Sequence, residues 1–580
     1  MLGEGSVRAV AAEEAGGAAG DPGRPPRPRR VPAALRRALT APPGSAWRDP
    51  VTWTVAALAL GAYFTISLFR LLTLTPSSYD LGIYTEFVRQ LSQLHAPVVD
   101  IMAPGFNLEG DHFQIAVGVL APFFRLWPTP ATLLFFQALF AAVSVFPVVT
   151  AASLLTGRST GRLIGFAYAF SWGLQQMIAF DFHEVALAVP LFAFSVSALV
   201  CRRPRAAIAW ALPLVFVKED QGFTVAAIGL LLGVTAAYPG LLPARPAVPA
   251  AAAVPPLRRP PRLPAWLGGR FLPRTPLDYP YIALWGGVFL LAWGLFWSTL
   301  AITVIIPHFN PLHEYRYWGA AGGALGGGKP FSVGGLLHQT STAWPTKVLT
   351  VVMLLLPTAF VALGSPVALL ALPSLGLRFI STDPSFWGTG WHYNATVMPI
   401  LFLAAAEAIG RWRRLPALAW PAAFRPPVSA RARLLRLWPG DRLGALAHAA
   451  KTGAARHGGA MMAAVAVALA FQFPVSSLWH GSTYTRDAHV AAADAAMALV
   501  PDGATVSTNL DLLAPLAART DTFWIGNAGN PVTRYIVFDG DDSGYSPAVT
   551  NVPPFIRQWY GKDGYVQIFS RDDVYVYRLG

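Results

Sequence analysis

The chain has 580 residues, of which 54% are hydrophobic and 13% are charged, and its formal net charge at neutral pH is +14. Soluble globular proteins carry roughly a quarter of charged residues, so this composition excludes an ordinary soluble protein and predicts an α-helical polytopic membrane protein. The single cysteine, Cys201, excludes a disulfide framework within the chain and a multi-cysteine metal cluster.

The positive charge is concentrated in three hydrophilic segments between apolar runs. Residues 1–49, 239–278 and 411–457 together hold more than half of the 44 basic residues. Arginine-rich segments of this kind mark the cytoplasmic side of a membrane protein. The charge therefore indicates topology, and nucleic acid is not expected as a partner.

The N-terminal part of the chain predicts a tail, an anchor and a polar loop. Residues 1–49 are rich in Pro, Arg, Ala and Gly, a composition that cannot build a core, so we expect a disordered cytoplasmic tail. The apolar run 50–74 is long enough to cross a bilayer and follows too long a tail to be a signal peptide. An outer loop, 75–130, follows, and its apolar segment 112–127 is too short for a span and predicts a surface helix.

Further apolar runs alternate across the membrane and give about eleven predicted spans within a membrane domain of residues 50–478. The N-terminus is then cytoplasmic and the C-terminus extracytoplasmic, in the cytoplasmic membrane of the cell. The basic segments 239–278 and 411–457 are cytoplasmic linkers, and 307–345 is a long outer loop with a Gly-rich stretch. The runs after the first are 131–156, 161–180, 184–200, 206–217, 221–238, 280–306, 346–364, 366–380, 394–410 and 458–478.

The last hundred residues, 480–580, change character and predict a small extracytoplasmic α/β domain. This segment has more acidic than basic residues, unlike the rest of the chain. An Ala-rich stretch at 488–500 predicts a helix, and 504–508 and 535–539 predict strands. The alternating runs 565–569 and 574–577 predict a hairpin.

Ionisable residues recur at the outer ends of the predicted spans. Such groups are costly at membrane depth and by default mark a functional site. We therefore expect a polar cavity that opens outward and is capped by the first loop and the tail. The residues are Asp80, Glu86, Asp111, His112, Asp181, His183, Glu184, Lys218, Glu219, Asp220, Arg316, Lys347, Arg378, Asp383 and His392.

Several short motifs occur in order along the chain: SSYDLGIYTEF from position 77, DHF at 111–113, FDFHE at 180–184 and KED at 218–220. In these the chain resembles the family of predicted membrane proteins called domain of unknown function 2079, over roughly residues 50–410. That family is similar to the C-type (GT-C) polyprenyl-phosphate-dependent glycosyltransferases, which place an acidic residue just after the first span. Asp80 matches that residue, although Leu81 follows it where those enzymes frequently have a second acidic residue.

The resemblance implies inverting transfer of a sugar. The donor would be a polyprenyl-phosphate-linked sugar presented from the lipid bilayer, and the acceptor an extracytoplasmic glycan, lipid or protein. Asp80 would be the general base, because one carboxylate suffices to deprotonate the attacking hydroxyl. Groups that bind the sugar or stabilise the departing phosphate would be His112, His183, Lys218, Arg316, Lys347 and Arg378, supported by Asp111, Asp181, Glu184, Glu219, Asp220 and His392.

Each of these assignments has a structural alternative. Ser-Ser-Tyr-Asp could simply begin a surface helix, and the KED motif could be a self-neutralising cluster. Pairs such as Asp181 with His183, or Asp111 with His112, would also suit a divalent cation, which is the one cofactor left open. No other cofactor is indicated by the sequence.

Two other classes of function remain open at this stage. A transporter or lipid flippase would have many spans, although no internal repeat of the kind that transporters often show is evident. A non-catalytic envelope scaffold would use the tail 480–580 to bind its partners. It would depend on that tail and not on Asp80.

Overall fold

The structure, a computed structural model, describes residues 46–76, 78–242, 278–317, 333–414, 439–541, 549, 551–561 and 563–580. Nearly all of the predicted tail 1–49, most of the linker 239–278, part of the linker 411–457 and the Gly-rich stretch of the predicted outer loop lie outside the described residues.

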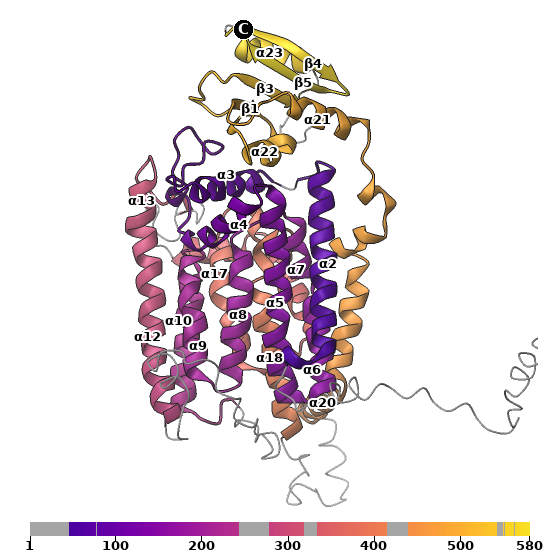
Figure 1. Cartoon of the computed structure of the whole chain (residues 1–580). Helices are drawn as coiled ribbons and strands as arrows, with labels where there is room; N and C mark the ends of the chain where they lie inside the picture. The colour runs from indigo at the N-terminus through magenta and orange to yellow at the C-terminus, as the bar shows by residue number, and fades with distance from the viewer. Residues whose placement is uncertain are drawn as a thin grey trace, which may run out of the picture. The chain divides into compact units, whose positions relative to one another are not determined.

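Helices form most of the described chain and pack into a bundle (Figure 1). Four of them are long and apolar enough to cross a membrane: Pro50–Leu72, Pro130–Thr156, Tyr279–Phe309 and His392–Arg414. The third combines α12 (Asp278–Leu300) and α13 (Ile306–Phe309), joined by a π-helical turn. The remaining long helices are labelled α2 (Pro50–Leu72), α5 (Pro130–Thr156) and α18 (Val397–Arg414). The other helices of the bundle are α6 (Arg158–Ala169), α7 (Trp172–Ala179), α8 (Val185–Val200), α9 (Pro204–Ala211), α10 (Gln221–Ala237), α15 (Val333–Ser341), α16 (Trp344–Leu355), α17 (Leu372–Phe379) and α20 (Pro439–Ala470).

Several predicted spans are shorter or more broken than their sequences suggested. The run 161–180 contains two helices, because α6 ends at Ala169 and α7 begins at Trp172. The run 206–217 ends in a 3-10 turn that contains Pro213, which lacks the N–H that an α-helix needs. Helix α20 begins at Pro439, inside the predicted linker. The total of eleven spans therefore stays a prediction.

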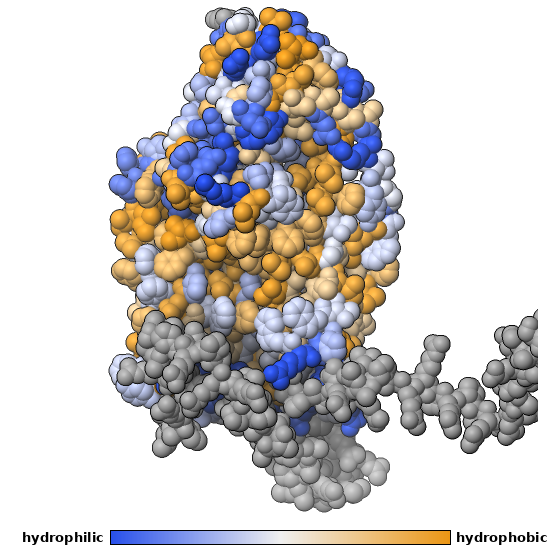
Figure 2. All heavy atoms as spheres, in the orientation of Figure 1, coloured by the Kyte–Doolittle hydropathy of each residue, from blue (hydrophilic) through white to orange (hydrophobic). Residues whose placement is uncertain are grey.

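Helix α3 (Asp80–Ser92) lies across one end of the bundle, which we call the α3 end (Figure 1). Its apolar residues Ile83, Tyr84 and Phe87 are buried. The segment predicted as a surface helix forms a 3-10 turn, Ile115–Leu120, that continues into α4 (Ala121–Leu126). Figure 2 shows apolar side chains over the middle of the bundle and polar side chains gathered at the α3 end.

The C-terminal segment, residues 488–580, contains a five-stranded sheet with the strand order β2-β1-β3-β5-β4. The predicted strand at 535–539 and the predicted hairpin are present, whereas the strand at 521–524 was not predicted. Strands β1, β2 and β3 are parallel, and β5 pairs antiparallel with β3 and β4. The elements are α21 (Ala488–Ala498), β1 (Thr505–Thr508), α22 (Leu510–Ala517), β2 (Asp521–Trp524), β3 (Tyr535–Asp539), α23 (Val552–Tyr560), β4 (Tyr565–Arg571) and β5 (Val574–Leu579).

Helix α3 also contacts the C-terminal segment. Leu513 of α22 packs where Gly82 has no side chain, since a Cβ at position 82 would lie 2.7 Å from the Leu513 Cδ2 atom. Arg89 and Asp521 form an ion pair at 3.2 Å. The side chain of Asn527 donates to the carbonyl of Ile101, in the loop after α3, at 2.9 Å. One helix therefore touches both the bundle and the sheet segment.

Helices α10 and α12 pack closely through glycines. A Cβ on Gly229 would lie 2.5 Å from the Gly287 carbonyl oxygen, and one on Gly294 would clash with the Gly222 carbonyl oxygen. Small residues at such crossings let two helix backbones approach each other within a membrane. This contact positions the end of α12, whose continuation reaches the candidate site.

Candidate functional site

A cavity of about 560 Å³ lies at the α3 end of the bundle. Residues from six separate parts of the chain line it: the start of α3, the loop before α4, the segment before α8, the segment before α10, the continuation of α12, and the region from α17 to α18. The predicted site residues in its lining are Asp80, Asp111, His112, His183, Lys218, Glu219, Asp220, Arg316, Arg378, Asp383 and His392. The cavity therefore brings together residues that are more than 300 positions apart in the sequence.

Asp80 is the first residue of α3 and borders the cavity. Its Oδ2 atom lies 3.8 Å from His183 Nε2, and 24% of its side chain remains exposed. Burial raises the pKa of Asp80 to about 7, and the nearby Glu184 carboxylate contributes in the same direction, because a second negative charge disfavours ionisation. A carboxylate with such a pKa can accept a proton near neutral pH.

Glu184 is a fully buried carboxylate beside Asp80 and His183. Its Oε1 atom lies 2.8 Å from the Lys218 ammonium, and its Oε2 atom lies 2.5 Å from His183 Nδ1. The hydroxyl of Tyr84 also contacts this carboxylate. The charge of Lys218 is therefore neutralised by Glu184 in a buried ion pair, and Tyr84 and His183 also contact the Glu184 carboxylate.

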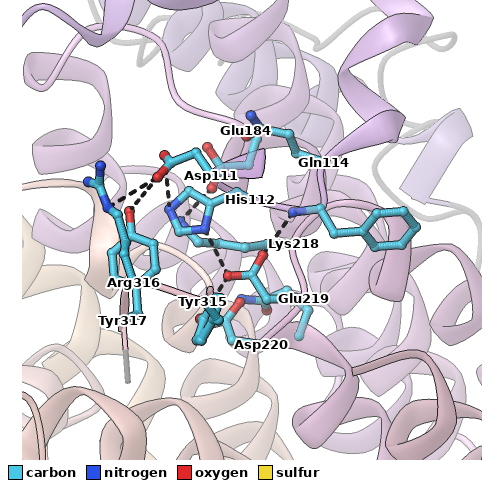
Figure 3. Close-up of polar contacts among 12 residues, drawn as sticks. Asp111, His112, Gln114, Glu184, Lys218, Glu219, Asp220, Tyr315, Arg316 and Tyr317 are labelled. Carbon is cyan, nitrogen blue, oxygen red and sulfur yellow. Dashed lines mark hydrogen bonds and ion pairs between the residues drawn. The ribbon is translucent and has the colours of Figure 1, made fainter. Parts of the chain in front are cut away.

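A second buried carboxylate, Glu219, is held by three donors (Figure 3). His112 Nδ1 lies 2.8 Å from its Oε1 atom, the Phe113 backbone N–H donates to Oε2 at 3.1 Å, and the Tyr315 hydroxyl donates to Oε1 at 3.0 Å. Burial lowers the pKa of His112, but the charges of Glu219 and Asp111 and the contact with Glu219 together outweigh burial and raise that pKa. The pair is therefore a charged cluster in the cavity wall.

Asp111 and the chain after α13 form the third cluster (Figure 3). The Arg316 guanidinium lies 3.2 Å from the Asp111 carboxylate, and the Tyr317 hydroxyl donates to it at 3.4 Å. The Tyr317 ring stacks on the His112 ring at a centroid distance of 4.6 Å. These contacts tie the continuation of α12 and α13 to the loop that precedes α4.

Arg378 and His392 form the wall contributed by the region from α17 to α18. The Arg378 guanidinium donates to the carbonyls of Phe386 and Gly388 and to the side-chain oxygen of Asn394, at 2.9, 3.2 and 3.0 Å. None of its contacts in the described part of the chain is with a carboxylate. The ring of His392 stacks on that of His183 at 3.5 Å, and its two nitrogens have no hydrogen-bond partner among the described residues.

Glu184 contacts His183 and Lys218 but is itself outside the cavity lining, and two further predicted site residues lie away from the cavity. The Lys347 ammonium donates to the carbonyls of Gln339 and Phe379 and sits 4.6 Å from the Trp387 ring centroid, outside the cavity lining. Asp181 is buried and pairs with Arg70 of α2 at 3.5 Å. Its positive φ of 75° is a left-handed conformation that non-glycine residues rarely adopt. Both residues support the backbone around the site and do not line it.

No site role was predicted for the tyrosines, glutamines, serines and threonine that complete the cavity, although Tyr315 was among the residues expected on the outer face. Tyr84 follows Asp80 by four residues, so both lie on one face of α3, and that spacing is a signal that could have identified it. Tyr315 and Tyr317 flank Arg316 and could not be placed without the fold. The additional polar lining residues are Tyr79, Tyr84, Gln114, Gln221, Tyr315, Tyr317, Ser374, Ser381, Tyr393 and Thr396.

The divalent cation left open by the sequence has no assembled ligand set in the structure. Within the described ranges, no group of three or more His, Cys, Asp and Glu side chains is arranged to hold a metal ion. Instead, the carboxylates of Glu184, Glu219 and Asp111 each pair with Lys, His or Arg side chains. The arrangement can accept a proton at Asp80 and can bind an anion beside Arg378.

Comparisons with known proteins identify a family. No curated protein sequence matches the chain. The crystal structure of ArnT from Cupriavidus metallidurans bound to undecaprenyl phosphate is similar, with 13% sequence identity and a TM-score of 0.47, and the match covers 91% of this chain and 97% of that chain. The family described as "Predicted membrane protein (DUF2079)" matches residues 70–535, which confirms the resemblance drawn from the motifs and extends it toward the C-terminus. The chain belongs to this family of multi-pass membrane proteins.

Proposed function

We propose that the protein is a membrane glycosyltransferase. It takes a sugar from a polyprenyl-phosphate-linked donor in the bilayer and transfers it to an acceptor outside the cytoplasm, with Asp80 as the general base. The observation that carries this proposal is the cavity itself, which holds a carboxylate with a pKa of about 7 and a buried guanidinium without a carboxylate partner among the described residues.

The departing phosphate would be stabilised chiefly by Arg378. Lys218 and Arg316 also line the cavity, but each is within 3.2 Å of a carboxylate oxygen, and Lys347 lies outside the cavity. Arg378 keeps its charge uncompensated by any carboxylate in the described residues. A preorganised cation aimed at developing negative charge is the main means by which enzymes stabilise a leaving anion.

The lipid part of the donor would lie against apolar side chains of the cavity. Phe223 of α10, Ile302 beyond α12 and Leu377 of α17 line it, and all three belong to apolar helices or their continuation. A polyprenyl chain can reach such a surface only from within the bilayer. The basic clusters at 157–162 and 201–205 lie at span ends that contribute nothing to the cavity lining, which supports an outward-facing α3 end.

The test is transfer of labelled sugar from a polyprenyl-phosphate donor by purified protein in nanodiscs. Asp80→Asn should lower the rate about 10²–10⁴-fold, which is the usual contribution of a general base. Asp100→Asn is a matched control, because Asp100 lies in the loop after the same helix, accepts from Gly105 N–H at 2.7 Å and is outside the cavity. Unchanged transfer by Asp80→Asn would refute the assignment of the base.

A transporter is less well supported by the cavity. Within the described ranges, its lining includes no residue from 157–162, 201–205 or 411–414, which are the basic ends of the bundle helices. A transport path has to connect both sides of the membrane, whereas these residues form a pocket at one end. Flux of the lipid-linked sugar across proteoliposomes that persists in Asp80→Asn would favour transport instead.

A further inference from the structure

The contact between Glu184 and His183 determines where the histidine carries its hydrogen. His183 Nδ1 lies 2.5 Å from Glu184 Oε2, although the two are not aligned as a hydrogen bond, and two proton acceptors cannot approach that closely without strong repulsion. An ionised carboxylate has no hydrogen to give, so Nδ1 must carry one. In a neutral imidazole the other nitrogen, Nε2, is then an acceptor.

This acceptor nitrogen faces Asp80. His183 Nε2 lies 3.8 Å from Asp80 Oδ2, and no other contact of the Nε2 atom competes for it among the described residues. The ring is held in place by its stacking on His392 and by the edge-on contact with Tyr84. At 3.8 Å the two atoms are too far apart for a direct hydrogen bond, so they can share a hydrogen only when Asp80 is protonated and its side chain moves about 1 Å closer, or when a hydroxyl lies between them.

We propose that Glu184 is a positioning residue that holds His183 in the Nδ1–H tautomer, so that His183 Nε2 accepts a hydrogen bond from Asp80 after Asp80 has taken the proton of the acceptor hydroxyl. This inference rests on the proposed function. It assigns His183 to the base and not to the donor phosphate, in contrast to the role that the family resemblance implied.

The proposed reaction is a single displacement at the anomeric carbon of the donor sugar. The acceptor O–H bond breaks and its proton moves to Asp80 Oδ2, while the acceptor oxygen forms a bond to the anomeric carbon. The bond between that carbon and the phosphate oxygen breaks, and the electron pair leaves with the polyprenyl phosphate. The new Asp80 O–H donates to His183 Nε2. Because this hydrogen bond stabilises the protonated form, it makes Asp80 a stronger base.

Glu184→Gln should reverse this tautomer. The amide has one oxygen and one NH₂ group, and the NH₂ group cannot face the Lys218 ammonium, which lies 2.8 Å from the Glu184 Oε1 atom. The amide oxygen therefore faces Lys218 and the NH₂ group faces His183 Nδ1. His183 must then carry its hydrogen on Nε2, where it donates to the Asp80 carboxylate and stabilises the ionised form, which weakens the base.

The main measurement is the pH profile of kcat/KM for sugar transfer. The acidic limb is the part of this profile where kcat/KM falls as the pH is lowered. In Glu184→Gln, this limb should lie about one pH unit lower, and the constant value of kcat/KM at higher pH should be about tenfold smaller. Glu407→Gln is the matched control: Glu407 is buried, lies near Arg411 of the same helix and is outside the cavity, so its limb should stay in place. A limb that does not move in Glu184→Gln overturns the proposal.

Other charged and titratable groups also face Asp80, and all except the substituted residue must be kept unchanged in this comparison. The nearest ones come from the start of α3, the loop before α4, the segments before α8 and α10, and the region between α17 and α18, and they raise or lower the pKa of Asp80. They are Tyr79, Tyr84, Asp111, His112, His183, Glu184, Lys218 and Tyr393. A purely structural effect of Glu184→Gln would lower activity without moving the limb.

A double-variant test separates positioning from general damage. His183→Phe keeps an aromatic ring against His392 but removes both nitrogens, so its limb should also move to lower pH. Adding Glu184→Gln to His183→Phe should then produce a smaller shift than Glu184→Gln produces alone, because only the direct effect of the Glu184 charge on Asp80 remains. Equal shifts in the two backgrounds would show that Glu184 acts on Asp80 only through its charge and would overturn the proposal.

A second readout does not depend on sugar transfer. In protein labelled with ¹⁵N-histidine, the His183 signals are identified by their loss in His183→Phe. They should show a hydrogen on Nδ1 in the unchanged protein and on Nε2 in Glu184→Gln. If the protein transfers no sugar but the tautomer reverses, the proposed function fails and the role of Glu184 in fixing the tautomer stands. A hydrogen on Nε2 in the unchanged protein refutes that role.

Discussion

Asp80 gives the proposed reaction a pH dependence. Burial raises its pKa to about 7, and a general base must be ionised to act, so activity is lost as pH falls through that value. We expect kcat/KM to fall about tenfold per pH unit below about 7 and to level off above it. Glu109→Gln is the control: burial also raises the pKa of Glu109 to about 7, but this residue is outside the cavity. Loss of the limb in Glu109→Gln would contradict the assignment to Asp80.

Residue types and motifs selected polar residues that the fold brings to one cavity, but the contacts of each residue could not be assigned from the sequence. Asp80, His112, His183, Lys218 and Arg378 were singled out as polar groups at span ends, and all five line the cavity. The role of each depends on distance, however. In the sequence, Lys218 and Arg378 are both basic residues at the end of a predicted span. Only the fold shows that Lys218 pairs with a carboxylate, whereas Arg378 donates to carbonyl and amide oxygens.

At the level of elements, the glycine contact between α10 and α12 determines where Tyr315 and Tyr317 lie. Gly294→Ala would place a methyl group against the Gly222 carbonyl oxygen and force the two helices apart, at a cost of about 1–3 kcal/mol. We expect a lower melting temperature in detergent and weaker sugar transfer. Gly233→Ala is the control, since a Cβ on Gly233 meets no atom within 4 Å, and equal melting temperatures for the two variants would contradict this account.

Element boundaries were harder to predict than element types. The hydropathy pattern identified the long apolar helices, because a stretch of about twenty apolar residues has few other uses. It missed the break at Phe170 and Ser171, since apolar residues continue on both sides of it, from 163 to 174. The short strand β2 (Asp521–Trp524) was also missed, because its two polar residues are followed by its two apolar residues and so do not alternate.

At the level of the whole molecule, α3 connects the cavity with the C-terminal segment through Leu513. Leu513→Lys would bury an unpaired charge against Gly82, and the C-terminal segment should then separate from α3. We expect faster release of a C-terminal fragment by limited proteolysis, together with reduced sugar transfer. Leu499→Lys is the control, because Leu499 lies in the same segment and is 43% exposed; equal proteolysis of both variants would contradict the prediction.

The wide sequence spacing of the cavity residues has a consequence for how the protein is made. Asp80, His183, Lys218 and His392 emerge from the ribosome in that order, and synthesis proceeds at roughly 5–20 residues per second. His392 is therefore synthesised some tens of seconds after Asp80, and the cavity wall from α17 to α18 does not yet exist during that interval. Until it does, Glu184 and Lys218 can already pair with each other, but His183 lacks the ring of His392 on which it stacks. The finished site is thus among the last parts of the bundle to be completed during biogenesis.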